Sequence, residues 1–386
     1  MEANRTSYDA IVVGAGHNGL TAAGYLAKAG LCVLVLERRA IVGGAAVTEE
    51  VAPGCRVSSC SYIASMLTPQ VIRDLDLARH GLKMLASDPA LSIVAGDGTA
   101  LRLWADPLRT ASELARFSAK DGETYLRVDA ELRRLARYLQ PFFLEPPPHI
   151  NATGVARIRE LWRIARRFWG ISGPEATALL QFMTGSLAEF LNRHFESNEA
   201  KRLFLANNVY GKHGGPYDAG STLGLLFHLL SGGDHEAQGF SGHVIGGMGG
   251  ITQAMAASVR SLGGTILTEA PVHRIRTENG RTNGVMLADG RMFDAPLVLS
   301  NADPKATFLG MIDPAHLDES FRSDVAAIRM DGPAAKLNLV LDAPPAFPGM
   351  PADATPGERA MLTLVGDMES AQRCYRSEER RVGKEC

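Results

Sequence analysis

Cysteine is scarce in this sequence, with 5 among 386 residues, and its positions are scattered. So few thiols exclude a small domain held together by disulfides and are typical of a protein in a reducing compartment. No apolar run approaches the roughly 20 residues that a membrane-spanning helix needs. The first apolar strand also begins too early for a secretory signal peptide to precede it. We therefore expect a cytoplasmic protein or one of an organellar matrix.

An excess of charge of either sign is also absent, because the formal net charge is −2 and the pI is about 6.6. A chain without a basic surface has no electrostatic basis for binding a polyanion, so we expect no nucleic-acid partner. Histidine and cysteine do not cluster at metal-ligand spacings, and no Ser-His-Asp order or carboxylate pair stands out. We therefore expect no metal and no hydrolytic chemistry.

Glycine, in contrast, is concentrated in the stretch AIVVGAGHNGL at residues 10–20. Four apolar residues predict a buried parallel strand, and the small and apolar residues after the glycines predict a helix. In a nucleotide-binding turn of this kind Gly14 makes the tight turn, Gly16 lets the backbone approach a pyrophosphate, and Gly19 lets the helix press against the strand. The stretch therefore predicts a dinucleotide site.

The next strand, LCVLVLE, ends at Glu37, where a carboxylate can accept hydrogen bonds from ribose hydroxyls and would repel a 2′-phosphate. This position disfavours NADP at the site. Six and seven residues later, Gly43 and Gly44 offer a second close backbone approach, for which an NAD site has no use. The cofactor expected from the residues is therefore FAD.

These residues resemble the N-terminal motif of the amine oxidase and phytoene desaturase group of flavoproteins. Within that group they are most similar to the branch named after pyridine nucleotide-disulphide oxidoreductase domain-containing protein 2, with its phytoene dehydrogenase-like bacterial members. The resemblance continues in residues 61–82, 246–275 and 287–304, and so spans most of residues 7–375. It implies an α/β protein: a glutathione-reductase-like, FAD-binding Rossmann fold with a mixed, largely helical substrate (cap) domain.

Helical patterns in the middle of the chain lie at residues 123–143, 154–170, 186–195 and 219–230. Together with the resemblance, they predict a nucleotide domain that is split in sequence. The expected order is FAD-binding domain, helical cap insertion, second FAD-binding part, and the incomplete start of a substrate-domain sheet, at residues 1–100, 101–238, 239–310 and 311–375.

The final residues 376–386, RSEERRVGKEC, have no apolar period and match the translation of a common sequencing adapter. We expect this tail to be an assembly artefact and the natural gene product to continue differently. On that basis the 386-residue chain is expected to hold FAD poorly and to lack activity.

The resemblance also implies the roles of individual residues. The glycines line the pyrophosphate, Arg38 lies near the adenine, and Val272 and Asn301 close the adenine side. The full set of expected FAD contacts is Gly14, Gly16, His17, Asn18, Gly19, Glu37, Arg38, Gly43, Gly44, Ala45, Val272 and Asn301.

Lys336 is the one candidate for the chemistry itself. Alternation in AAKLNLVLD predicts a strand that places Lys336 and Asn338 on one face and leucines on the other. In the amine oxidases a lysine at the corresponding place holds a water against flavin N5. A lysine on a solvated strand face is the alternative.

Two further patterns allow both a functional and a structural interpretation. GGMGG at residues 246–250 precedes a predicted helix, but its glycines do not follow the dinucleotide pattern, so we favour a junction loop over a second nucleotide site. Cys55 and Cys60 have the spacing of a redox disulphide, but they lie in a strand-like stretch rather than at a helix start, so we favour two incidental cysteines.

The function expected from these features is hydride transfer from a C–H bond of a small hydrophobic substrate to flavin N5. An NAD(P)H-dependent flavin reductase and a non-catalytic FAD-bearing partner protein remain as alternatives. Residues 154–170 form a basic amphipathic helix, which either packs on a core or makes a peripheral membrane contact.

Overall fold

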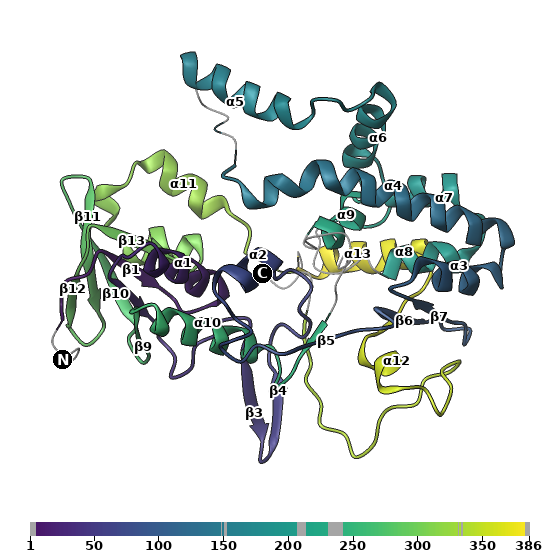
Figure 1. The fold of residues 1–386 in the computed structure, drawn as a ribbon, viewed down its shortest axis with the longest axis horizontal. Coiled ribbons are helices and arrows are strands. Elements are labelled where there is room, and N and C mark those ends of the chain that lie inside the picture. The colour runs from purple at the N-terminus through teal and green to yellow at the C-terminus, as the bar shows by residue number, and fades with distance from the viewer. Residues whose placement is uncertain are drawn as a thin grey trace. The chain divides into compact units, whose positions relative to one another are not determined.

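The computed structural model describes residues 5–147, 149, 153–206, 214–230, 242–330, 332 and 335–382. Figure 1 shows the path of the chain, which divides into two compact units. Unit 1 comprises residues 1–85, 243–331 and 336–340. Unit 2 comprises residues 86–242, 332–335 and 341–386.

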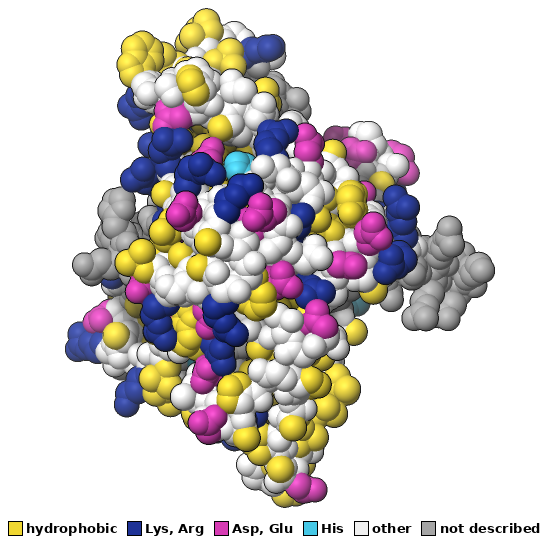
Figure 2. Space-filling model, turned by 90° about the vertical axis from the view of Figure 1, so that its right-hand side faces the viewer, with side chains coloured by type: hydrophobic (Ala, Val, Ile, Leu, Met, Phe, Trp, Pro, Cys, Tyr) yellow, Lys and Arg dark blue, Asp and Glu magenta, His cyan; other side chains and the backbone are white. Residues whose placement is uncertain are grey.

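Basic and acidic side chains are interspersed over the face of the molecule that Figure 2 shows, in keeping with the net charge of −2. Within the described ranges, none of the helices has both the length and the apolar character needed to cross a bilayer.

A four-stranded parallel sheet with the order β13-β1-β2-β9 forms the centre of unit 1. Val13 lies opposite both Leu36 and Ser300, so the segments that follow these strands leave the sheet at one edge. All residues of β1 and β2 are buried, as the two apolar runs predict. The bounds are Ala10–Val13 (β1), Val33–Leu36 (β2), Thr265–Leu267 (β9) and Leu297–Ser300 (β13).

The sheet is covered on both faces, which explains why its strands are apolar throughout. Helices α1 (His17–Lys28) and α10 (Gly249–Ser261) pack on the face that carries Val12 and Val35. An antiparallel sheet packs on the face that carries Ile11 and Leu34. Its strands are β10 (Val272–Glu278), β11 (Arg281–Leu287) and β12 (Met292–Asp294). Unit 1 is therefore built in three layers.

A hairpin follows the second glycine pair and returns the chain toward the sheet. It consists of β3 (Thr48–Ala52) and β4 (Cys55–Ser58). The other elements of this unit are α2 (Pro69–Asp74), the π-helix η1 (Ala306–Met311), the 3₁₀ turn η2 (Pro314–His316) and α11 (Glu319–Ala327), with the short strands β5 (Met84–Ala86) and β8 (Gly242–Val244) at its borders.

The strand predicted for AAKLNLVLD is wrong, because residues 335–340 follow an irregular path. Leu337 is 79% exposed and Leu339 is 63% exposed, although alternation places them on a covered face. A strand requires a neighbour to satisfy its backbone N–H and C=O groups. No described segment pairs with these residues as a strand.

Unit 2 combines helices with one small sheet in the order β14-β6-β7. Its strands are β6 (Leu91–Val94), β7 (Ala100–Leu103) and β14 (Leu362–Leu364). Its helices are α3 (Pro107–Ala115), α4 (Ala119–Leu144), α5 (Gly154–Arg167), α6 (Gly173–Thr184), α7 (Leu187–His194), α8 (Asn198–Ala206), α9 (Leu223–Leu230), α12 (Pro356–Ala360) and α13 (Met368–Val382). The helices predicted from the patterns in this part of the sequence are confirmed.

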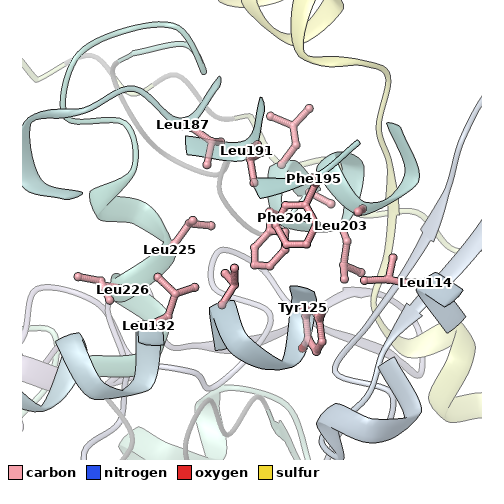
Figure 3. Packing of buried hydrophobic residues seen from close by; sticks show 14 of the residues in the cluster. Leu114, Tyr125, Leu132, Leu187, Leu191, Phe195, Leu203, Phe204, Leu225 and Leu226 are labelled. Carbon is pink, nitrogen blue, oxygen red and sulfur yellow. The ribbon is translucent and has the colours of Figure 1, made fainter. Parts of the chain in front are cut away.

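The core of unit 2 lies between α4 and the helices that follow it. Tyr125 and Leu132 of α4 belong to the same buried cluster as Leu191, Phe204 and Leu226, which come from three later helices (Figure 3). The helix α4 presents a continuous apolar face for this contact, as its 3.6-residue period predicts.

The unit borders differ from the expected domain borders at two places. The sequence predicts residues 86–100 in the nucleotide domain, but β6 pairs with β7 and β14 in unit 2. The sequence also predicts that residues 311–331 begin a substrate-domain sheet. Instead these residues belong to unit 1, where Phe321 of α11 packs edge to face on Phe308 at 5.0 Å.

Candidate cofactor site

The first glycine turn lies at the carboxyl end of β1. Gly14 has a φ of +93°, and its N–H donates to the Leu36 carbonyl at 2.7 Å. A Cβ on Gly19 would lie 2.1 Å from the Gly14 carbonyl oxygen. Only glycine at this position lets α1 approach the strand so closely, which is the role that the motif predicts.

The start of α1 is suited to an anion. Gly16 is the N-cap, no side chain caps the helix, and its first turn carries no acidic residue. The backbone N–H groups of such a turn attract phosphate oxygens. His17 and Asn18 are exposed here. The protein atoms around its ring lower the pKa of His17 by desolvation.

The second glycine pair lies directly against the first turn. The Gly43 N–H donates to the Ala15 carbonyl at 2.9 Å, and Gly43 pairs with Gly16 in an isolated bridge. Gly44 has a φ of +57°, and a Cβ on it would lie 3.1 Å from the Gly16 Cα. Gly44 and Ala45 are exposed. The two turns therefore lie side by side and present mainly backbone atoms, with almost no side chains, to a ligand.

Glu37 follows β2 at the same edge of the sheet and is buried. One carboxylate oxygen accepts the Ala15 N–H at 2.9 Å, and the other accepts the Arg39 N–H at 3.0 Å. Each oxygen keeps a further lone pair for a hydroxyl donor. The carboxylate is thus held in place beside the glycine turn.

The segment before β10 runs along the residues that follow β2. The Ala270 N–H donates to the Glu37 carbonyl at 2.9 Å, and the Glu269 N–H donates to the Arg39 carbonyl at 3.0 Å. Val272 begins β10 directly afterwards, and Arg38 is exposed. The structure therefore brings Arg38 and the approach to Val272 to the Glu37 side of the site.

Asn301 lies on the first glycine turn. Its N–H donates to the Val13 carbonyl at 2.8 Å, and a Cβ on Gly16 would lie 2.8 Å from its side-chain nitrogen. It reaches this turn because β13 pairs with β1 on the side away from β2. That Asn301 closes the adenine side together with Val272 stays a prediction.

Comparison with known proteins decides the family. Residues 19–380 match the family described as flavin containing amine oxidoreductase. The chain belongs to this family. It is 34% identical over 364 residues to the pyridine nucleotide-disulfide oxidoreductase domain-containing protein 2 of Mus musculus, a match that covers 90% of this chain and 62% of that protein. The chain therefore spans less than two thirds of the length of this relative.

More distant relatives include the hydroxyneurosporene desaturase of Cereibacter sphaeroides, 29% identical over 78% of this chain and 57% of that protein. A solved oxidoreductase structure from Methanosarcina mazei aligns with a TM-score of 0.54 and 18% identity, over 82% of this chain and 64% of that chain. This likeness confirms the α/β FAD-binding fold class that the sequence predicts.

The cofactor of this flavin-dependent family member is FAD. The residues present fit it on two observations. The two adjoining glycine turns are so close that a Cβ on Gly16 would meet the Asn301 side chain at 2.8 Å and a Cβ on Gly44 would meet the Gly16 Cα at 3.1 Å, and Glu37 presents a fixed carboxylate beside them. The first turn would bind a pyrophosphate, and Glu37 would bind ribose hydroxyls.

The glycines at residues 246–250 have a packing role. The Gly249 N–H donates to Thr48 Oγ1 at 2.9 Å, and the Met248 N–H donates to Ser58 Oγ at 3.0 Å. A Cβ on Gly247 would lie 2.4 Å from Thr48 Oγ1. The start of α10 is therefore occupied by the β3–β4 hairpin, which favours the junction-loop interpretation over a second nucleotide site.

Sequence reasoning missed these two hydroxyls. Thr48 and Ser58 lie in a hairpin about 200 residues before the helix that they cap. A Ser or Thr in a strand carries no signal of such a role. The sequence feature that could have indicated them is the start of α10, where methionine and glycine supply no capping side chain of their own.

Cys55 and Cys60 are both free. Cys55 begins β4, as the strand-like pattern of CRVSSCSYI predicts, and is not at a helix start. The structure gives no helix dipole to activate either thiol. Among the described residues, no group of three or more His, Cys, Asp or Glu side chains is arranged to hold a metal.

Lys336 lies over the end of the β3–β4 hairpin. Its ammonium donates to the Ser58 carbonyl and lies 5.6 Å from the centre of the Tyr62 ring. Asn338 donates to the Ser59 carbonyl at 3.3 Å, so the two side chains that alternation groups together do share one contact surface. Desolvation lowers the pKa of Lys336.

Proposed function

We propose that this protein is an FAD-dependent oxidoreductase of the dehydrogenase or desaturase type, acting on a C–H bond of a hydrophobic substrate. The observation that carries the proposal is the anchored Glu37 carboxylate beside two stacked glycine turns. Family membership supports it, and so does the presence of a named desaturase among the relatives.

When bound, the flavin supplies the redox chemistry, because its N5 accepts a hydride. The substrate loses that hydride from one carbon and a proton from its neighbour to solvent, so that two electrons leave and a double bond forms. The task of this chain is to bind and orient the cofactor. Glu37 holds the ribose, and the N–H groups at Gly16 and the start of α1 hold the pyrophosphate.

Lys336 is proposed to hold a water near flavin N5. The hydrogen bond from its ammonium to the Ser58 carbonyl holds the ammonium on the β3–β4 hairpin, which follows the second glycine pair. A Lys336→Met variant should retain FAD, because none of the cofactor-binding contacts described above involves Lys336, and its reduced flavin should be reoxidised by oxygen more slowly. Stopped-flow absorbance measures this rate, with the exposed Lys83→Met as matched control. Reoxidation at the wild-type rate would remove Lys336 from the mechanism.

The direct test of the proposal is anaerobic titration of the flavin-bound natural gene product with candidate donors. Bleaching of the flavin absorbance by an apolar C–H donor, with formation of the unsaturated product, is the expected result. Bleaching by NADH or NADPH alone would instead establish the flavin reductase. Failure of every donor class to bleach the flavin would favour a non-catalytic FAD-bearing partner.

A further inference from the structure

The helix α5 has its apolar face turned to solvent. Val155 is 82% exposed, Ile158 68%, Leu161 57% and Trp162 60%, and Trp169 just beyond the helix is 86% exposed. No residue of α5 is buried. An ordinary surface helix shows the opposite arrangement, with its apolar stripe on the core.

The inner face of α5 is held by charged groups and by its C-terminal end. Arg163 pairs with Glu160 at 2.8 Å and with Glu145 at 3.7 Å, and Arg167 also pairs with Glu145. Phe168, directly after the helix, stacks on Phe142 of α4 at 5.8 Å. These contacts join one side of α5 and its C-terminal end to the end of α4, and the apolar stripe lies on the other side.

The charge beside the exposed stripe is entirely positive. At 100° per residue, Arg159 and Arg166 border the stripe on one side and Arg157 borders it on the other. Arg157 and Arg159 make no ion pair with any residue in the described part of the chain, and Arg166 lies 5.1 Å from the Trp162 ring centre. The one acidic residue of the helix, Glu160, is paired on the inner face.

The next helix also exposes apolar side chains. Leu180 and Met183 of α6 are 64% and 45% exposed. Figure 1 places α5 and α6 at the outer edge of the helices of unit 2, and hydrophobic side chains gather at the corresponding end of the molecule in Figure 2, with basic side chains beside them.

We propose that this surface docks on an anionic lipid bilayer, with α5 lying flat in the interface. Apolar side chains that include two tryptophans would enter the boundary of the acyl chains, and arginines on both borders would meet lipid phosphates. A protein partner for this surface would need a partly apolar groove with acidic residues along both of its edges, to match the apolar stripe and the arginines beside it. The inference is independent of the proposed chemistry, because none of these residues belongs to the cofactor site.

The test is flotation of the full chain with vesicles of phosphatidylcholine alone and of phosphatidylcholine with phosphatidylglycerol. Binding should require the anionic lipid and weaken with salt. Two of the three tryptophans lie on the surface, at positions 162 and 169. In a Trp104→Phe background, their emission should shift to shorter wavelength when vesicles bind.

Two sets of variants locate the binding surface. The triple variant Arg157→Glu, Arg159→Glu, Arg166→Glu should lower partitioning by at least about 100-fold, since each lost basic residue contributes about fivefold and the new carboxylates add repulsion. The double variant Ile158→Ser, Trp162→Ser should lower it comparably. Both change exposed positions, so folding should be retained. The exposed Arg79→Glu and Leu108→Ser serve as matched controls and should bind as the wild type does.

Equal binding to both vesicle types, absence of binding, or binding that survives both α5 variants would overturn the proposal. Self-association that the α5 variants abolish, without vesicle binding, would assign the surface to a second copy of the chain instead.

Discussion

The position of Glu37 beside the cofactor site can be predicted from the sequence, but the contacts that hold its carboxylate cannot. Its position at the end of an apolar strand predicts a ribose contact, and the structure places it beside the glycine turn. The two backbone N–H groups that fix it, from Ala15 and Arg39, have no sequence signal, because a main-chain donor is the same in every residue. The type and position of a charged residue can therefore be taken from a sequence, whereas the backbone groups that hold its side chain cannot.

The neighbours of Asn301 depend on the folded sheet. The resemblance identifies Asn301 as a site residue, but which residues of the site it contacts depends on strand order. Because β13 pairs with β1, Asn301 packs on Gly14, Gly16 and Gly19. Strand order is a property of the folded sheet, and the residues near Asn301 do not predict it.

A prediction at this scale concerns Asp97 in unit 2. Hydrogen bonds from Thr99 and Arg202 lower the pKa of Asp97 from 3.8 to about 2. Because the folded pKa is the lower one, these contacts stabilise the fold above about pH 4 and stop doing so as the pH falls through about 2. The difference in unfolding free energy between wild type and Asp97→Asn should therefore shrink from pH 5 to pH 2. Urea unfolding at each pH measures it, and a difference that stays constant would contradict the assignment.

At the scale of elements, the predictable ones carry their own pattern. The buried run of β1, the second strand and the amphipathic α4 are all found where the sequence predicts them. The predicted strand at residues 335–340 has an equally clear alternation and does not form. Alternation shows that a segment is compatible with a sheet, but only a neighbouring strand makes it one.

The contact between α1 and β1 gives a second prediction. Gly19→Ala would place a Cβ 2.1 Å from the Gly14 carbonyl oxygen, so the helix must move away from the strand. We expect a loss of about 3 kcal/mol in unfolding free energy. Gly30→Ala, just after α1, is the control. Gly30 has a φ of +86°, but a Cβ on it would meet no atom within 4 Å. This variant should lower the unfolding free energy by about 1 kcal/mol. Chemical denaturation that ranks the two variants equally would refute the packing role of Gly19.

The capping of α10 by the hairpin gives a third. Thr48→Val keeps the shape of the side chain but leaves the buried Gly249 N–H without its acceptor. We expect destabilisation by about 1–3 kcal/mol. Thr177→Val, at an exposed position of α6, should change the stability by less than about 0.5 kcal/mol. If thermal unfolding places both variants at the wild-type midpoint, the hydroxyl does not cap the helix.

At the scale of the whole molecule, unit 1 is interrupted in the sequence by most of unit 2, which is rich in helices. The borders of the units differ from those expected for the domains. The borders differ because β6 pairs with β7 and with β14, about 270 residues later, and because α11 packs on η1. Both contacts join segments whose own patterns do not identify their partners.

The central claim is that the edge of the parallel sheet in unit 1 binds FAD through Glu37 and the glycine turns. The most direct measurement is FAD affinity by fluorescence titration of wild type, Glu37→Ala and the exposed control Glu50→Gln, with circular dichroism to verify that each apoprotein is folded. A hydrogen bond to a charged group contributes about 1.5–3 kcal/mol, so Glu37→Ala should bind FAD about 10- to 100-fold more weakly while Glu50→Gln matches the wild type. A folded Glu37→Ala variant with unchanged FAD affinity would contradict the account.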